Sequence, residues 1–531
     1  MNPLLLPHGM TSQEIRRRTL LQGLGAGALL AGVGGLATAC SPAEDKKTVT
    51  GATGEPRRGG ILRIGASGGA GTDTLDAHNP LTNTDFARLA QLYDPLLRLD
   101  HEGKFQMVLA EEAEPDSSGQ VWTIKIREGV QTHDGATLEA ADVLYSFQRI
   151  QENKLAGSSL LIPIDFSASK VLDKRTVQLS FIRPNAIFKQ VIANHASFNI
   201  VPRGYDPARP IGTGPFKLKS FKPGVESTVT RFDNYWDAGK PHLDGIVTLN
   251  MADETTQVNA LQSGQVDAVN YMSAQSIRQL QNSGAVVTVS ETGGWAPITM
   301  RVDQAPFEDV RVRQALRLLV DRQQMLDIVF AGHGTIGNDV FGVVDPLSGF
   351  DKVRQRDVEQ AKSLLKAAGR SDLQLTLLTN DVVPFQKSVA QLFAQQAKEA
   401  GVSVNVSQKT ATDFFATDYL KAPFAQDYWF NLPYLGNVAG ATAASAAYNA
   451  THFNDSEYEK LFEQATATRD ENLQRQIIAD MQNIDFERGG NIIPFFYPQI
   501  DATTTKVGGI VKDVSGFPFG NYDFKNIWLN S

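Results

Sequence analysis

Two strand–helix–strand units, far apart in the chain, place the strongest constraint on its fold. Each unit combines an apolar strand, a helix and a second apolar strand, and these segments are 246–249, 254–263 and 266–269 in the first unit and 373–378, 385–400 and 402–406 in the second. Gly264 and Gly401 stand where a glycine C-cap ends a helix. Because such a crossover builds an α/β layer, the sequence predicts at least two α/β lobes.

A strand-rich stretch between 95 and 210 predicts an additional module. Residues 121–127 alternate between apolar and polar side chains, which is typical of a half-buried strand. A helix is expected after Gly135, with Thr137 as its N-cap, acidic residues in its first turn, and an inner face of Val143, Phe147 and Ile150. Long helices are expected in the second lobe, near 309–329, 357–368 and 456–487.

The start of the body combines a strand, a turn and a helix. Residues 61–64 predict a strand that runs into a glycine-rich turn, and a helical face of four apolar residues follows, formed by Phe86, Leu89, Ala90 and Tyr93.

Charge and cysteine content exclude several classes of protein. The 531 residues suit two to four domains, and they carry 50 basic and 58 acidic side chains for a net charge of -8. Without a segregated basic patch, this surface predicts no nucleic-acid partner. The single cysteine excludes a disulfide framework and the usual multi-cysteine zinc sites.

The first forty residues have the features of an export signal. Three arginines including Arg17 and Arg18 precede a charge-free apolar run from 20 to 39, which ends at Cys40. The arginines followed by Thr19-Leu20-Leu21 resemble a twin-arginine signal, and 37–40 resemble a lipobox with Ala37 in place of the usual leucine. We therefore expect signal residues 1–39, a lipidated Cys40 that anchors the chain to the membrane, and a tether over 40–57. A plain anchor helix or an ordinary signal remains the alternative.

Motifs for covalent or metal chemistry are weak. Gly65-Ala66-Ser67-Gly68-Gly69 matches a nucleophile elbow, but no helix is expected to begin directly after it, so a tight turn near a ligand is favoured over a serine hydrolase. The eight histidines are scattered and no two lie within four residues. The sequence predicts no catalytic residue, no metal site and no cofactor.

Aromatic and amide side chains predict a binding rim. Residues 427–434 combine tyrosine, tryptophan and asparagine, and they lead through a small-residue loop to Tyr448. Flat rings and amides of this kind hold polar organic ligands. Trp295 and Tyr271 are expected to join the cluster, with core or hinge packing as the alternative for each ring.

Several stretches, in order, resemble family 5 extracellular solute-binding proteins, the peptide/nickel group of ABC-importer receptors. They are Tyr93-Asp94-Pro95-Leu96-Leu97-Arg98-Leu99, Trp122-Thr123-Ile124-Lys125-Ile126-Arg127-Glu128-Gly129-Val130, His133-Asp134-Gly135, Ala141-Asp142-Val143, Gly212-Thr213-Gly214-Pro215-Phe216, Asn234-Tyr235-Trp236, Gly264-Gln265-Val266-Asp267, Pro306-Phe307-Glu308-Asp309-Val310-Arg311-Val312-Arg313-Gln314-Ala315 and Asp321-Arg322. Together they cover nearly all of the body from 58 to 531.

The resemblance implies a two-lobed α/β periplasmic-binding-protein fold, type II of the large cluster, with an additional inserted domain. Domain I would be 58–94, 212–292 and 497–531, domain II would be 95–211, and domain III would be 293–496. It further implies a non-enzymatic, monomeric receptor in the periplasm or cell envelope, which closes on a small solute and delivers it to an ABC permease with a cytoplasmic ATPase. A sensor or scavenger on the same fold is the alternative.

One departure from the family bears on the ligand. Peptide-binding members generally carry an aspartate a few residues after the domain III tryptophan, and residues 431–437 after Trp429 contain no acid. A buried ammonium without a carboxylate is costly, so a modified peptide-like, opine-like or sugar-conjugate solute is expected. The expected contacts are Gly69, Ala70, Tyr271, Trp295, Trp429, Asn431, Tyr434, Tyr448 and His452.

Overall fold

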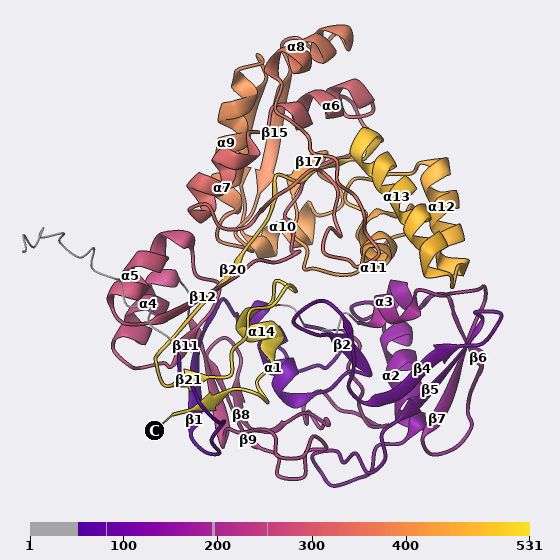
Figure 1. Ribbon diagram of the computed structural model, residues 1–531, viewed down its shortest axis with the longest axis vertical. Helices are drawn as coiled ribbons and strands as arrows, with labels where there is room; N and C mark the ends of the chain where they lie inside the picture. Colours follow the sequence, from indigo (N-terminus) through magenta and orange to yellow (C-terminus); the bar gives the residue numbers. More distant parts are fainter. Residues whose placement is uncertain (1–50, 81, 194–196, 252, 531) are drawn as a thin grey trace, which may run out of the picture. The chain divides into compact units, whose positions relative to one another are not determined.

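Most of the chain folds into two α/β lobes, one built on a seven-stranded sheet and the other on a five-stranded sheet (Figure 1). The computed structural model describes residues 51–80, 82–193, 197–251 and 253–530, which belong to one compact unit. The expected signal, with Arg17 and Arg18, and the lipidation site Cys40 lie outside the described residues.

The first lobe is built on the seven-stranded sheet. Its strands, in spatial order, are β12 (Val286–Ser290), β20 (Gln499–Thr503), β11 (Ala268–Val269), β1 (Ile61–Ser67), β10 (Gly245–Met251), β9 (Glu226–Arg231) and β8 (Phe216–Lys222). Its helices are α1 (Asn83–Leu92), α4 (Glu254–Gln262), α5 (Ile277–Asn282) and the 3₁₀ turn η2 (Ala274–Ser276). The predicted first crossover is confirmed, with β1 parallel to and between β10 and β11. The carboxyl ends of these three strands therefore lie at one edge of the sheet.

The second lobe is built on the five-stranded sheet. In spatial order its strands are β16 (Ser403–Gln408), β15 (Gln374–Thr379), β17 (Phe424–Gln426), β13 (Ile298–Met300) and β18 (Asn491–Ile492). The predicted second crossover is confirmed, because β15 and β16 are parallel neighbours joined by α9 (Gln386–Lys398). The other helices are α6 (Val310–Leu318), α7 (Arg322–Phe330), α8 (Val358–Ala367), α10 (Ala411–Thr417), α11 (Tyr434–Asn437), the π turn η3 (Val438–Thr442), α12 (Ser456–Ala467) and α13 (Glu471–Arg488).

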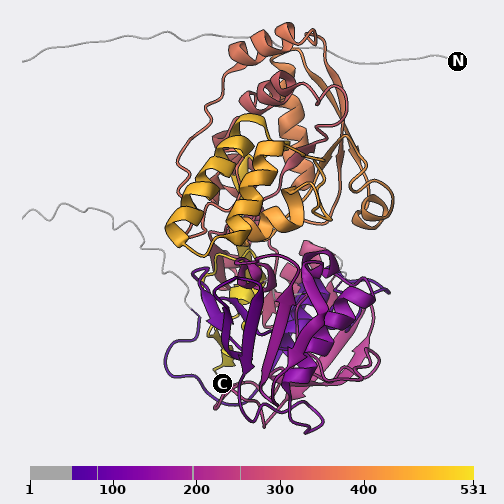
Figure 2. The same ribbon diagram turned by 90° about the vertical axis from the view of Figure 1, so that its right-hand side faces the viewer.

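Two of the expected long helices are wrong, because each is a pair of helices. Asp321 accepts a hydrogen bond from the Gln324 amide and begins α7, so the segment 309–329 is broken after α6. Asp470 likewise caps α13, which runs beside α12 in Figures 1 and 2. An N-cap aspartate starts a new helix at these positions because its carboxylate binds amides that have no partner within the helix.

The strand-rich module is a four-stranded antiparallel sheet. Its strands, in spatial order, are β4 (Ala110–Pro115), β5 (Val121–Ile126), β7 (Thr176–Phe181) and β6 (Ile164–Val171), accompanied by α2 (Ala140–Glu152), α3 (Phe188–Ile192) and the 3₁₀ turn η1 (Ser158–Leu161). Val143, Phe147 and Ile150 of α2 are buried as predicted. The predicted cap Thr137 is wrong: Glu139 is the N-cap, in a capping box with Asp142.

The remaining strands form three short antiparallel pairs. They are β14 (Thr335–Ile336) with β19 (Phe495–Phe496), β2 (Leu97–Leu99) with β3 (Phe105–Met107), and β21 (Val507–Gly508) with β22 (Trp528–Leu529). The chain passes between the lobes twice, from β12 to β13 and from β19 to β20. The sheets draw on the ranges expected for domains I, II and III, and the boundaries themselves stay a prediction.

The C-terminal segment contains an unusual turn. The element α14 (Pro518–Tyr522) has left-handed backbone at Phe519, Gly520 and Asn521, with φ of 54°, 68° and 63°. Residues with a side chain rarely adopt this backbone conformation. Its free-energy cost is offset here by burial of the turn and by hydrogen bonds to neighbouring elements.

Candidate ligand-binding site

The glycine turn after β1 is held in one conformation by close contacts. Gly68 and Gly69 have φ of 86° and 93°, in the left-handed region that favours glycine. A Cβ on Gly69 would lie 1.9 Å from the Asn250 Nδ2 atom, so a side chain cannot be accommodated there without movement. The amide of Ala70 donates to Asp73 Oδ1 at 2.8 Å. The predicted contact residues Gly69 and Ala70 therefore present backbone from a fixed turn.

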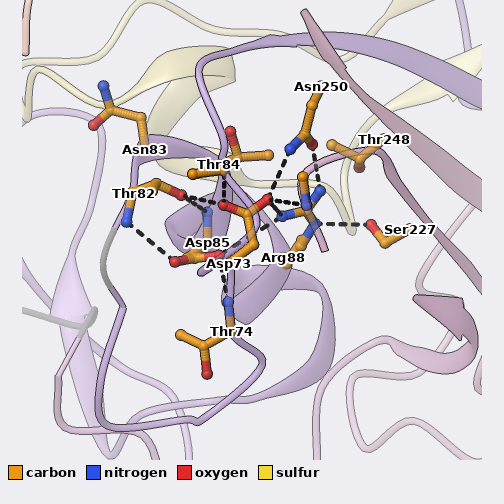
Figure 3. Close-up of polar contacts among 12 residues, drawn as sticks. Asp73, Thr74, Thr82, Asn83, Thr84, Asp85, Arg88, Ser227, Thr248 and Asn250 are labelled. Atoms are coloured by element: carbon orange, nitrogen blue, oxygen red, sulfur yellow. Dashed lines mark hydrogen bonds and ion pairs between the residues drawn. The ribbon is translucent and has the colours of Figure 1, made fainter. Parts of the chain in front are cut away.

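Asp73 and Arg88 form the buried centre of the network that supports this turn (Figure 3). Asp73 Oδ2 accepts hydrogen bonds from Arg88 Nη1 at 2.8 Å and from Asn250 Nδ2 at 2.7 Å. Arg88 also donates to the Asn250 and Ser227 side chains. The Asp73 and Arg88 side chains are only 0% and 1% exposed. Asp85 Oδ1 also lies 3.6 Å from Arg88 Nη1, so removing Arg88 would leave two buried carboxylates without this counter-charge.

The charge state of Asp73 is set by these neighbours. Burial alone would raise its pKa, but the hydrogen bonds from Ala70, Asn250 and Arg88 together lower the pKa below its ordinary value. The carboxylate is therefore ionised at neutral pH and ties the turn to α1 and β10.

Trp295 and Trp429 form the centre of the aromatic cluster. The two residues pair through reciprocal backbone hydrogen bonds of 2.9 Å and 2.8 Å, and their indole rings stack with centroids 5.8 Å apart. Phe341 stacks on the other face of Trp295, and Tyr448 meets Trp429 edge-on at 6.2 Å. Trp295 is fully buried, whereas Trp429 and Tyr448 are half-buried. Trp429 and Tyr448 thus keep ring surface available to a ligand.

Asp427 holds the Trp429 indole in place. Its Oδ2 atom accepts from Trp429 Nε1 at 3.1 Å and from the Tyr419 hydroxyl at 3.2 Å, while Oδ1 accepts from the Tyr428 amide. Burial raises the pKa of Asp427 to about 6, although these hydrogen bonds act to lower it. The carboxyl group is therefore engaged with its own lobe.

Asn431 lies at the junction of the two lobes. Its backbone N–H donates to the Ser515 carbonyl at 2.8 Å. A Cβ on Gly293 would lie 2.4 Å from the side-chain Oδ1 atom of Asn431. This Oδ1 atom is buried and accepts no hydrogen bond from the described residues. An acceptor without a partner costs free energy unless a ligand or water satisfies it.

Tyr434 and His452 have other partners. Tyr434 is fully buried, stacks on Phe341 and donates to Asp485 Oδ2 at 2.7 Å. The ring of His452 lies against Arg301 and the Leu420 carbonyl, at 3.1 Å and 2.9 Å. Both arrangements suit packing within the second lobe, and the ligand contacts expected of these residues stay predictions.

Tyr271 lies just past β11, in left-handed backbone with φ of 54°. It is 9% exposed and lines a cavity with Tyr497. Tyr497 in turn donates its hydroxyl to the Trp429 carbonyl at 3.0 Å. Tyr497 therefore connects the surroundings of Tyr271 with those of Trp429.

Sequence reasoning missed Phe430 and Tyr497. Phe430 stacks on Phe517 with centroids 3.9 Å apart and meets Phe86 edge-on at 5.9 Å, so it contacts the first lobe. The sequence did contain one indication for Phe430, because it directly follows Trp429 in the aromatic segment. For Tyr497 the sequence offered only an aromatic residue within an apolar run.

The geometry around Ser67 does not make a nucleophile elbow. β1 continues through Ser67, and α1 begins only at Asn83, whereas an elbow turns directly from strand into helix. Among the described residues, no three His, Cys, Asp or Glu side chains group as a metal site. In the same part of the chain, no helix has the length and apolarity needed to span a membrane.

Comparison with known proteins identifies a family. The family model of bacterial extracellular solute-binding proteins, family 5 Middle, matches residues 104–454. The glutathione-binding protein GsiB of Salmonella paratyphi A is 29% identical over 358 residues, which span 65% of this chain and 69% of GsiB.

Solved structures share the fold. The periplasmic binding protein DppA of Helicobacter pylori, in complex with the peptide STSA, aligns with a TM-score of 0.78 at 18% identity over 90% of this chain and 99% of its own. AgaA of A. tumefaciens R10, in complex with agropinic acid, aligns with a TM-score of 0.77 at 24% identity over 89% and 99%. The chain has the two-lobed α/β fold of these proteins and belongs to the bacterial extracellular solute-binding proteins of family 5, the periplasmic or extracellular substrate-binding components of ABC importers.

Proposed function

We propose that the protein captures a small polar organic solute between its lobes and hands it to an ABC permease. The proposed solute is a peptide-like, opine-like or sugar-conjugate molecule. The relatives named above bind glutathione, a peptide and agropinic acid, which are all small polar organic molecules. This range agrees with a site of flat rings, amides and turn backbone.

The arrangement around Trp429 carries the proposal. Its ring is half-buried and held from behind by Asp427, and the acceptor oxygen of Asn431 lies two residues further along the chain. Because Asp427 is engaged by Trp429 and Tyr419, this segment offers no free carboxylate to a ligand ammonium. A solute without an unmodified peptide amino terminus is therefore favoured.

The proposed contacts follow from the exposed surface of the rings and of the turn, and for Asn431 from its acceptor oxygen without a partner among the described residues. Trp429, Tyr448, Asn431 and the backbone of Gly69 and Ala70 touch the solute in this proposal. Trp295 and Tyr434 support the rings from behind.

We further propose that binding proceeds without covalent chemistry. The receptor acts as a monomer exported by a twin-arginine-like signal over residues 1–39 and anchored through lipidated Cys40. The family membership and the sequence features of the leader support this part of the proposal.

Native mass spectrometry of protein purified from its own host tests the proposal. We expect a co-purified solute, and we expect Trp429→Ala to weaken its binding by about 1–3 kcal/mol through loss of stacking. Trp429→Phe is the matched control, since it retains a ring and should keep most of the affinity. Unchanged affinity in Trp429→Ala would remove this residue from the site. Tight binding of unmodified tripeptides would contradict the inference about the amino terminus.

A further inference from the structure

A cavity lies beside the chain crossing that joins the lobes, and we call it the hinge cavity. Its walls include Tyr271 of the first lobe, Phe330, Val383 and Phe385 of the second lobe, and Tyr497 and Ile500 at the crossing into β20. The volume within it that the centre of a water molecule can occupy is about 70 Å³. The cavity therefore has room for several waters, which is comparable to the size of a small substituted ring.

The chemistry of its walls is neutral. Every side chain that lines the hinge cavity is uncharged, and most are aliphatic or aromatic. The polar groups on the walls are hydroxyls and amides, including Ser388 and Gln499. A charged group would enter without a counter-charge on these walls, which is unfavourable, whereas an apolar group gains from leaving water.

The cavity is connected to both the hinge and the aromatic cluster. The Met272 amide donates to the Ile500 carbonyl at 2.9 Å, which ties the Tyr271 segment to β20. On the opposite wall, Phe385 packs on Tyr497 with ring centroids 5.4 Å apart. Tyr497 also bonds the Trp429 carbonyl. A group in the cavity therefore contacts both lobes at the junction where they meet and lies next to the segment that carries Trp429.

We propose that the hinge cavity is a subsite that binds an uncharged, apolar or aromatic group of the captured solute. This inference rests on the proposed receptor function and narrows its substrate class to solutes that join a polar body to a neutral apolar group. Because the walls come from both lobes, occupation of this subsite favours the closed arrangement that creates them.

Three small probes and two variants of the full chain test the subsite. The probes are p-cresol, benzoate and benzylamine, which share a ring and differ in charge, and binding is measured by saturation-transfer NMR titration. We expect p-cresol to bind with a Kd on the order of 1 mM and the charged probes to bind at least about tenfold more weakly. Ser388→Trp fills the exposed mouth of the cavity from α9, so p-cresol binding should also fall at least about tenfold.

Gln395→Trp is the matched control, because this exposed residue lies seven positions further along α9 and does not line the cavity. It should bind p-cresol like the unaltered protein, and circular dichroism should show both variants folded. Absence of p-cresol binding, equal binding of the charged probes, or full binding by Ser388→Trp would each overturn the inference. If a co-purified solute is still recovered from the same preparations, the receptor function stands although the subsite fails. This outcome separates failure of the subsite from failure of the proposed function.

Discussion

Gly69 is the residue at which backbone conformation and a neighbouring side chain impose the same requirement. Both its φ of 93° and the approach of Asn250 exclude a Cβ, whereas Gly68 has a φ of 86° and nothing within 4 Å of a Cβ. We expect Gly69→Ala to lower the free energy of unfolding by about 2–4 kcal/mol, since left-handed strain and a clash add. Gly68→Ala should cost only about 1–2 kcal/mol from strain. Urea unfolding of both variants measures the difference, and equal losses would contradict the role of Asn250.

The residues around this turn show what the sequence could and could not predict. The glycines and the half-buried Trp429 were predicted because they stand in recognisable local patterns. The network of Asp73, Arg88 and Asn250 was not, because Asn250 lies 177 positions from Asp73 and meets it only through the pairing of β1 with β10. Roles that depend on such long-range contacts, including that of Asp427 behind Trp429, become visible only in the folded chain.

At the scale of elements, the start of α1 is joined by hydrogen bonds to the glycine turn after β1. The Thr82 hydroxyl accepts from the Asp85 amide at 3.2 Å and also contacts Asp73 Oδ1 at 3.3 Å. We expect Thr82→Ala to lower the free energy of unfolding by about 1–2 kcal/mol, because an N-cap and a link to Asp73 are lost together. Thr82→Ser keeps the hydroxyl and should retain most of the stability in thermal and urea unfolding. A Ser variant as unstable as the Ala variant would argue against the cap.

Element boundaries explain most of the errors of sequence-based prediction. β1, β5 and the strands of both crossovers were predicted because their apolar patterns are strong. The caps were less predictable, since Thr137 and Glu139 both precede α2 and only the hydrogen bonds identify Glu139. At the left-handed turn, Gly520 and Asn521 are residue types that tolerate this conformation, whereas Phe519 adopts it against its own preference because tertiary contacts impose it.

β20 carries a buried acid that makes stability depend on pH. Asp501 is 2% exposed and accepts hydrogen bonds from the Phe519 amide and the Gln499 side chain. Burial, aided by the charge of Asp513, raises the pKa of Asp501 to about 7 despite these bonds. Because the folded pKa exceeds the unfolded value of about 3.9, the stabilisation is complete below pH 4 and is lost as pH rises through 7.

Asp501→Asn removes this dependence while keeping an acceptor for Phe519. Between pH 5 and 8, we expect the free energy of unfolding of the unaltered protein to fall relative to the variant by on the order of 2 kcal/mol. Urea unfolding at several pH values measures this difference. Asp372→Asn on an exposed loop should follow the unaltered protein. Parallel curves for Asp501→Asn and the unaltered protein would show that Asp501 is not responsible.

For the whole molecule, closure of the lobes in the proposed receptor would depend on contacts that cross between them. Backbone bonds join the lobes at Asn431 and Ser515, and the ring of Phe430 is one apolar contact between them. It stacks on Phe517 and meets Phe86 edge-on, and both of these residues belong to the first lobe. These ring contacts join the lobes as the structure has them, so in the proposed receptor their free energy adds to that of the solute in stabilising this arrangement.

Phe430→Ala should therefore act on closure rather than on either lobe. We expect the affinity for the co-purified solute to fall by about 0.5–1.5 kcal/mol, or roughly 2- to 12-fold, and the radius of gyration of the ligand-free protein to increase in small-angle scattering. Phe415→Ala is the matched control, because this 38% exposed ring packs on Phe414, Tyr419 and Tyr428 within the second lobe. If Phe430→Ala matches the control in both measurements, the ring is packing without a part in closure. A loss of affinity with unchanged scattering would instead make Phe430 a direct contact of the solute.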